Sequence, residues 1–175
     1  MGHPMPPTSH SAPSIRVVRD DDTASLARIY NHYVVHSTVT FEEEPIDAGE
    51  MERRVHEVLE SGLPWMVADT AGVVVGYAYA SRWKTRVGYR FSAELSVYLT
   101  PEASGHGLGR QLYESVLEQL TTLGIHAAIG GIALPNEACV ALHEKLGFVQ
   151  VAHFRETGKK SGAWIDVGYW ERLLQ

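Results

Sequence analysis

The predicted fold depends on one stretch of the chain, which reads Glu94-Leu-Ser-Val-Tyr-Leu-Thr-Pro-Glu-Ala-Ser-Gly105-His-Gly107-Leu-Gly109-Arg-Gln-Leu-Tyr-Glu-Ser-Val-Leu117. Apolar residues alternate with small or polar ones between Leu95 and Leu99, as they do in a half-buried strand. Glycines then occupy three alternate positions, and apolar residues at helical spacing follow, namely Leu108, Leu112, Val116, Leu117 and Leu120. A strand, a glycine loop and a helix in this order leave backbone N–H groups free at a helix N-terminus, where an anion is favoured. The stretch therefore predicts a turn that holds a phosphate group.

The residues around Gly109 exclude two common phosphate loops. A Walker loop ends in Gly-Lys-Ser or Gly-Lys-Thr, whereas Gly109 is followed by Arg110 and Gln111. The Rossmann fingerprint requires a glycine at the position that Arg110 occupies. The pattern that remains is Gly-x-Gly-x-Gly-Arg after a strand, and a glycine turn without a ligand stays open as the alternative reading.

Composition limits the class of protein. The chain has 175 residues, 45% of them apolar and 21% charged, so we expect one globular domain over residues 14–175. Residues 1–13 are rich in Pro, Ser and His and are expected to form a disordered tail. A net charge of −6 argues against broad binding to nucleic acid. We find no apolar run long enough for a membrane span and no apolar signal core, and the single Cys139 cannot form an internal disulfide, so a cytoplasmic location is expected.

The hydrophobic pattern predicts about seven strands and four helices in the order β-α-α-β-β-β-α-β-α-β-β. One predicted strand spans residues 89–99, and another spans 125–134 with Gly130-Gly131 inside it, where a ligand or another backbone could come close. A short helix is expected from Pro135 to Leu146. The chain is expected to end in a hairpin of residues 148–155 and 164–173 around a loop at 158–162. This order predicts an α/β (α+β) fold with a mixed, mostly antiparallel seven-stranded sheet packed by helices.

The glycine loop, the element order and a second segment together resemble the GNAT acyltransferases. That segment, Leu134-Pro-Asn136-Glu-Ala-Cys-Val-Ala-Leu-His143-Glu-Lys-Leu-Gly147-Phe148, resembles the family's short helix that opens at Asn and ends in Leu-Gly-Phe. The resemblance implies the GNAT fold, with central strands splayed to admit the co-substrate acetyl-CoA. Asn136 could serve a pantetheine amide or act only as a helix N-cap. Ser104 departs from the family, which usually has Gln or Arg there. The cofactor-binding residues implied are Val97, Tyr98, Leu99, Gly105, His106, Gly107, Leu108, Gly109, Arg110 and Asn136.

Further motifs resemble the branch of phosphinothricin and methionine sulfoximine N-acetyltransferases, over about residues 14–172. They include Asn31-His-Tyr, Ser37-Thr-Val-Thr-Phe41, Trp83-Lys-Thr-Arg86, Leu142-His-Glu and Trp164-Ile-Asp-Val-Gly-Tyr-Trp170. This resemblance implies a homodimer and herbicide-resistance activity. The acceptor would be a small amino acid analogue such as phosphinothricin, methionine sulfoximine or methionine sulfone. Lys84, Arg86 and Tyr89 would hold it, and Phe41 could line the same pocket.

Acetyl transfer requires two proton movements, and two residues are candidates for them. The amine loses a proton before it attacks the thioester, and the leaving thiolate gains one. Glu94 starts the central strand and could take the first proton; the alternative is a solvated glutamate at a strand end. His143 lies two helical turns after Asn136 and is expected to point toward the thiol; the alternative is a core or surface histidine. We expect direct attack within a ternary complex.

Other functions stay open at this point. The acceptor could be a polyamine or a protein N-terminus, although such acceptors favour an acidic groove and Lys84 and Arg86 favour an anionic small molecule. A non-catalytic CoA-binding sensor is the alternative from another class. His32 and His36 have the i, i+4 spacing of metal ligands, but no third ligand is suggested, so no metal site is predicted.

Overall fold

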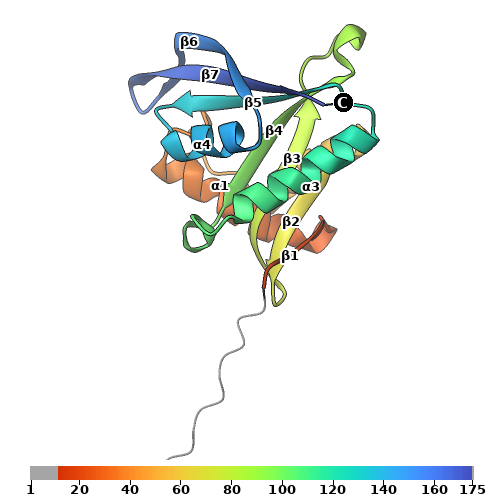
Figure 1. Cartoon of the computed structure of the whole chain (residues 1–175). Coiled ribbons are helices and arrows are strands. Elements are labelled where there is room, and N and C mark those ends of the chain that lie inside the picture. The colour runs from red at the N-terminus through yellow and green to blue at the C-terminus, as the bar shows by residue number, and fades with distance from the viewer. Residues whose placement is uncertain (1–11, 175) are drawn as a thin grey trace, which may run out of the picture.

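The computed structural model describes residues 12–174, so the tail predicted for residues 1–13 lies almost entirely outside the described part of the chain. Strands and helices follow one another in the predicted order (Figure 1). Their bounds are β1 Ser14–Val17, α1 Thr23–His36, α2 Ala48–Glu60, β2 Trp65–Thr70, β3 Val73–Arg82, β4 Ser92–Leu99, α3 Leu108–Thr122, β5 Ala127–Leu134, α4 Glu137–Lys145, β6 Val149–Lys160 and β7 Ala163–Leu173. Three single 3₁₀ turns are η1 Asp20–Asp22, η2 Val87–Tyr89 and η3 Pro101–Ala103.

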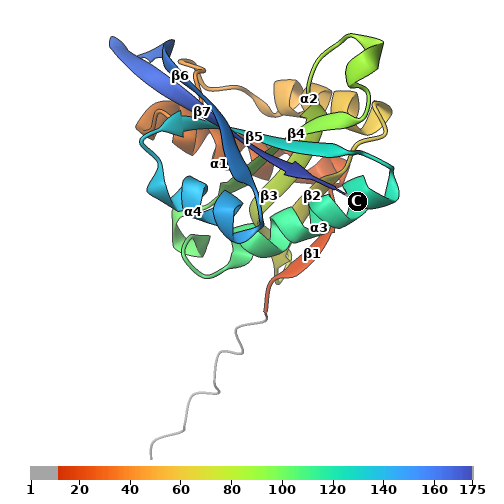
Figure 2. The same ribbon diagram turned by 45° about the horizontal axis from the view of Figure 1, so that its top comes forward.

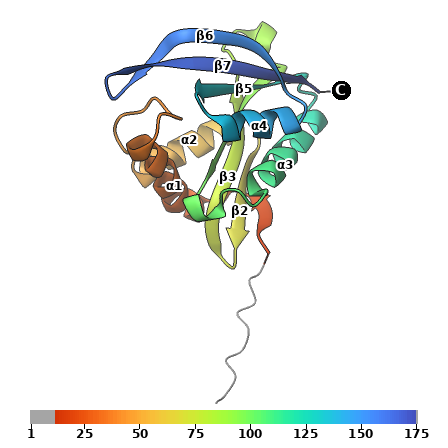
Figure 3. The same ribbon diagram turned by 60° about the vertical axis from the view of Figure 1, so that its left-hand side comes forward.

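The seven strands form one sheet in the order β1-β2-β3-β4-β5-β7-β6. Every neighbouring pair is antiparallel except β4 and β5, which are parallel. Helices α1 and α2 cover one face of the sheet, and α3 and α4 cover the other (Figure 3). The predicted fold class, a mixed and mostly antiparallel seven-stranded sheet packed by four helices, is therefore confirmed.

The sheet opens at its one parallel pair. β4 and β5 are paired only from Ser92 to Glu94 on β4 and from Ala127 to Ile129 on β5. Beyond these residues the two strands run apart, and α4 lies over the gap (Figure 1). The predicted splay of the central strands is confirmed, and it begins immediately after Glu94.

Periodic apolar side chains hold α3 against the sheet behind this gap. Leu112, Val116 and Leu120 are buried, as the 3.6-residue period requires of one helix face. They pack on the same core as Val67 and Ala78 of β2 and β3. The rigid helix fixes where its own N-terminus, and so the glycine loop, can lie.

Several predicted boundaries are wrong, and the strand expected from residue 125 begins at Ala127. The strand expected from residue 89 begins at Ser92, because Val87–Tyr89 forms the η2 turn. The short helix begins after Asn136 rather than at Pro135. The last hairpin has no loop at residues 158–162, since β6 continues to Lys160 and turns at Ser161-Gly162. A bulge between Phe154 and Gly158 carries the strand past the small residues that suggested a loop. The long hairpin stands out beyond the rest of the sheet (Figure 2).

A buried lysine ties this hairpin to the α1–α2 loop. The Lys160 side chain is 4% exposed, and its ammonium donates to the Thr40 carbonyl at 2.8 Å and to the Tyr33 carbonyl at 3.5 Å. In the same region the Phe41 ring packs directly on Gly158, where a Cβ would overlap it. The hairpin therefore positions the loop that carries Phe41.

Lys160→Met is expected to lower the free energy of unfolding by about 1–3 kcal/mol, because the methionine keeps the apolar stem but leaves the Thr40 carbonyl without its donor. For a chain of this size the melting temperature should fall by several degrees. Lys159→Met is the matched control, since Lys159 is exposed with its ammonium 5.0 Å from the Trp164 ring centre. Equal melting temperatures for the two variants in a calorimetric scan would contradict the anchoring role of Lys160.

Candidate active site

A cleft of about 710 Å³ lies where β4 and β5 part. Five segments line it: the second half of β4, the glycine loop with the start of α3, the second half of β5, the inner face of α4, and the end of α1 with the loop after it, through Tyr33 and Val39. Among the cofactor-binding residues predicted from the sequence, those lining the cleft are Val97, Tyr98, Leu99, Gly105, Gly107, Gly109, Arg110 and Asn136. The structure thus brings together residues that are up to about 40 positions apart in the chain.

The free edge of β4 presents backbone polar groups to this cleft. The Thr100 N–H donates to the Val75 carbonyl of β3 at 2.8 Å. Because backbone groups alternate in direction along a strand, those of Leu95, Val97 and Leu99 face away from β3 and toward the gap. An extended ligand that carries amides could pair with this edge as a neighbouring strand would.

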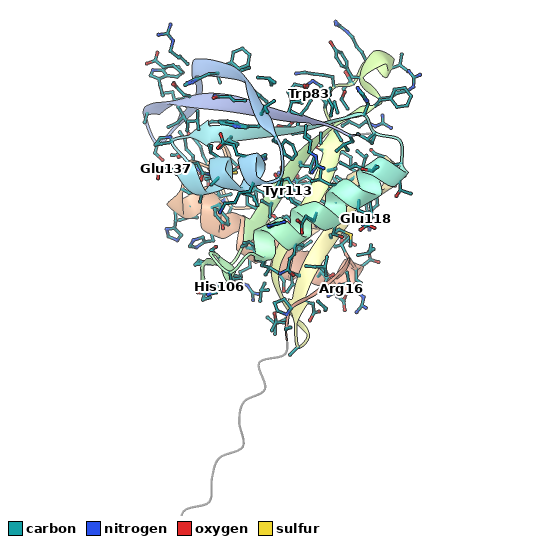
Figure 4. All side chains as sticks on the ribbon, viewed as in Figure 1. Arg16, Trp83, His106, Tyr113, Glu118 and Glu137 are labelled. Atoms are coloured by element: carbon teal, nitrogen blue, oxygen red, sulfur yellow. The ribbon has the colours of Figure 1, made fainter. Side chains whose placement is uncertain are left out.

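The glycine loop leaves the N-terminus of α3 without a side-chain cap. Gly105 and Gly107 have φ values of 81° and 79°, a left-handed conformation that side chains other than glycine rarely adopt. Gly107 is the N-cap residue and supplies no capping oxygen, so the first N–H groups of α3 have no side-chain partner. Leu108 is buried, so only its backbone can serve a ligand, and His106 lies exposed on the loop (Figure 4). The loop therefore presents backbone N–H groups without side-chain partners at a helix N-terminus, an arrangement that favours anions in proteins generally.

The Asn136 amide has its oxygen committed and its nitrogen available. Its Oδ1 accepts the Cys139 N–H at 3.1 Å, which caps α4. Asn136 can therefore act both as the helix N-cap and as a ligand-binding residue. The cap bond fixes the amide through its oxygen, while Nδ2 stays available at the cleft.

Glu94 sits at the fork of the two strands. Its side chain is half-buried, and a Cβ on Gly131 of β5 would lie 2.9 Å from Glu94 Oε1. Burial raises the pKa of Glu94, and the positive charge of Lys84 partly offsets that effect. A carboxylate with a raised pKa is a better proton acceptor than an exposed one.

His143 is buried on α4, with a side chain 2% exposed. Its Nδ1 lies 2.8 Å from the Cys139 carbonyl and must donate to it, since a carbonyl only accepts. Burial lowers the pKa of His143, so the ring is neutral and Nε2 accepts the hydroxyl of Tyr113 at 3.2 Å. That hydroxyl also lies 3.3 Å from the Leu95 carbonyl. His143 therefore lines the cleft in contact with Tyr113, a residue that the sequence analysis did not single out.

Adjacent glycines place Glu94 and His143 on opposite faces of the sheet. A Cβ on Gly130 would overlap the His143 ring, whereas a Cβ on Gly131 would crowd Glu94. Successive residues of a strand point to opposite faces, so His143 lies on the α3–α4 face and Glu94 on the α1–α2 face. The predicted close approach at Gly130-Gly131 is real, but side chains of the chain itself make it.

The residues predicted to hold the acceptor are only partly brought together. Lys84 is near enough to Glu94 to influence its pKa. Arg86 and Tyr89 lie on the exposed η2 turn, and no hydrogen bond, ion pair or aromatic contact within residues 12–174 joins them to Glu94. Phe41 lies on the α1–α2 face, packed on Gly158. The roles of Arg86 and Tyr89 stay predictions.

Cys139 of α4 is partly buried and is not in a disulfide. Burial raises the pKa of the Cys139 thiol to about 11, which keeps it protonated and unreactive at neutral pH. No group of three or more potential ligands among the described residues could hold a metal ion. Nor does any described helix combine the length and apolarity needed to cross a membrane.

A sheet opened at one parallel pair, behind a glycine loop that exposes a helix N-terminus, defines the class of acyltransferases with splayed central strands. The chain belongs to the GNAT family of acetyltransferases, since the acetyltransferase (GNAT) domain matches residues 15–168. It is accordingly an N-acetyltransferase by family.

Named relatives share most of the chain. A phosphinothricin N-acetyltransferase of Alcaligenes faecalis is 40% identical over 92% of this chain and 82% of its own length. The L-methionine sulfoximine/L-methionine sulfone acetyltransferase of Salmonella typhimurium is 32% identical over 92% of this chain and 94% of its own. A crystal structure of a GNAT phosphinothricin acetyltransferase from Sinorhizobium meliloti, in complex with acetyl-CoA, superimposes with a TM-score of 0.90 at 36% identity, covering 93% of this chain and 89% of that one.

Proposed function

We propose that this enzyme transfers the acetyl group of acetyl-CoA to the α-amine of a small amino acid analogue of the phosphinothricin, methionine sulfoximine or methionine sulfone type. The observation that carries the proposal is the opening between β4 and β5, which has cofactor-binding groups along it and Glu94 at its closed end. The substrates named for the relatives from Alcaligenes and Salmonella support this choice of acceptor.

The cleft has polar groups without hydrogen-bond partners among the described residues, and acetyl-CoA could bind to them. The diphosphate would accept hydrogen bonds from the N–H groups of residues 105–110, where no side chain caps α3. The pantetheine amides would pair with the backbone of Val97, with the Leu99 N–H and with Asn136 Nδ2, because the Leu99 carbonyl already accepts the Tyr33 hydroxyl at 2.7 Å. Ser104 adds no contact to this set, because its hydroxyl donates to the Thr100 carbonyl at 3.2 Å.

Because Glu94 and His143 lie on opposite faces of the sheet, the two proton transfers take place on different faces. The acceptor amine loses its proton on one face, and the leaving sulfur gains a proton on the other. Glu94 takes the proton from the acceptor amine on the α1–α2 face, which frees the nitrogen lone pair to attack the thioester directly. On the α3–α4 face the leaving sulfur needs a proton. The Nδ1 proton of His143 is held by the Cys139 carbonyl, and the one hydroxyl proton of Tyr113 is shared between His143 Nε2 and the Leu95 carbonyl. Tyr113 supplies the proton by turning its hydroxyl from these acceptors to the sulfur, and the bond to His143 holds the hydroxyl in place until then.

Two alternative functions, acetylation of a polyamine and CoA binding without catalysis, have less support. A cationic polyamine would be repelled by Lys84, whose charge lies close to Glu94. A sensor without catalysis would have no need of a half-buried carboxylate with a raised pKa at the closed end of the gap.

Release of free thiol from acetyl-CoA, measured against a panel of amines, tests the proposal. We expect turnover with methionine sulfone, methionine sulfoximine or phosphinothricin and none with spermidine or a peptide N-terminus. Calorimetry with CoA provides the control for the binding cleft. Binding of CoA without turnover of any amine would favour the sensor. No binding of CoA would refute the assignment of the cleft as the acetyl-CoA site.

A further inference from the structure

We propose that three aromatic side chains, Trp83, Phe154 and Tyr169, form the subsite for the side chain of the acceptor and select amino acids whose side chain ends in a methyl group. We call them the aromatic cluster. The inference rests on the proposed function and adds to it the part of the site that distinguishes one amino acid from another.

Tyr169 is the centre of the aromatic cluster. Its ring centre lies 5.4 Å from that of Trp83 and 5.8 Å from that of Phe154, both in edge-to-face geometry. The ring is also packed on Gly131, where a Cβ would be 3.1 Å from it. The same Cβ on Gly131 would also lie close to Glu94 Oε1, so the Tyr169 ring and the Glu94 carboxylate are on the same face of the sheet.

Strand register places the other two rings on this face. Tyr169 pairs with Gly131 of β5, and Phe154 pairs with Val167 of β7, two residues before Tyr169. Residues two apart on a strand point to the same side. Trp83 directly follows β3, and its edge-to-face contact with the Tyr169 ring places it beside Tyr169. Phe154 is 53% exposed, so the aromatic cluster offers apolar surface to a ligand beside Glu94.

The surroundings of the aromatic cluster match the three parts of a free α-amino acid. The Glu94 carboxylate faces the amine, and the Lys84 ammonium supplies a positive charge for the α-carboxylate. Lys84 Nζ lies 4.6 Å from the centre of the Trp83 ring, which places the cation at the border of the aromatic cluster. The remaining contact surface is aromatic and suits a terminal methyl group, whereas a carboxylate at the very end of the side chain would be desolvated there without a partner. Methionine sulfone and norleucine fit this surface, whereas glutamate does not.

Substitution of Tyr169 tests the inference with acceptors of similar length. Tyr169→Ala is expected to lower kcat/KM about tenfold or more for methionine sulfone and norleucine, mainly through a higher KM, the loss typical of one aromatic contact. The residual rate with glutamate should change less than about threefold, and Tyr169→Phe should keep the wild-type preference. Phe91→Ala is the matched control, because Phe91 is 46% exposed and its ring packs on Arg90. Equal losses for all acceptors, or none, would overturn the inference.

Calorimetric binding of methionine sulfone to the CoA-loaded enzyme separates this inference from the proposed function. Binding should be about tenfold weaker in Tyr169→Ala and unchanged in Phe91→Ala. Binding that depends on Tyr169 without turnover would overturn the proposed function alone. Turnover with binding that is independent of Tyr169 would overturn the role of the aromatic cluster alone, and no binding of any amino acid would overturn both.

Discussion

Replacement of Glu94 by Gln is expected to lower kcat by about 10²–10⁴-fold, the range that general-base catalysis supplies. The amide keeps the size of the side chain at the fork between β4 and β5, but it cannot take a proton from the acceptor. Because Glu94 lies on the α1–α2 face, whereas the cofactor groups line the gap, the dissociation constant for CoA should not change. Glu118→Gln is the control, since Glu118 is exposed on α3 and points away from the cleft (Figure 4).

The pH dependence of the wild-type enzyme provides a second test of Glu94. Burial raises the pKa of this carboxyl group, and the base acts only when ionised. The rate should therefore rise with pH through a value above that of an ordinary glutamate and level off once Glu94 is deprotonated. In the Gln variant this acid limb should disappear from the profile of kcat/KM. An unchanged rate or an unchanged acid limb would remove Glu94 from the mechanism.

The glycine loop and the short helix after Asn136 could be predicted because their signals are local. Alternating apolar residues, three glycines and a helical stripe determine a strand, a turn and a helix without reference to the rest of the chain. The end of the chain was harder, since the bulge between Phe154 and Gly158 depends on pairing with β7. Without that pairing, Gly158, Lys159 and Lys160 before the turn have the composition of a loop.

The residues that the sequence analysis missed are those whose role depends on register. Tyr113 falls on the apolar stripe of α3 and reads as core, and only the tertiary structure brings its hydroxyl to His143. Tyr169 lies in the segment from Trp164 to Trp170, which the sequence analysis uses only as a motif of the family resemblance. Its pairing with Gly131 is what places it beside Glu94. The Gly130-Gly131 pair was a usable signal of close approach, but it did not say which side chains approach.

The division of the site between two faces follows from the alternation of a single strand. Gly130 and Gly131 are consecutive, so the space that each leaves lies on a different side of the sheet. One space admits the His143 ring, and the other admits Glu94 and Tyr169. A methyl group added at either position should therefore damage one half of the reaction and spare the other.

Gly130→Ala is expected to act on the α3–α4 face and to lower kcat at least tenfold while the acceptor KM changes little. The new methyl would overlap the His143 ring, which is held between Phe148 and Tyr113 with ring centres 5.1 Å away from each. In a packed core the ring cannot move without breaking its bond to the Tyr113 hydroxyl. Overpacking of this kind costs about 1–3 kcal/mol, so the melting temperature should also fall by several degrees.

Gly131→Ala is expected to act on the α1–α2 face instead. Its methyl would lie 2.9 Å from Glu94 Oε1 and 3.1 Å from the Tyr169 ring, so the acceptor KM should rise and kcat should fall while CoA still binds as in the wild type. Gly88→Ala is the control for both variants, because nothing lies within 4 Å of a Cβ at that position. Steady-state kinetics with each substrate varied in turn, together with calorimetry on CoA, would separate the two patterns. His143 and Glu94 are separated by a single β-sheet, so the two variants should differ only if each face carries its own proton transfer. The same kinetic pattern in both variants would refute that assignment.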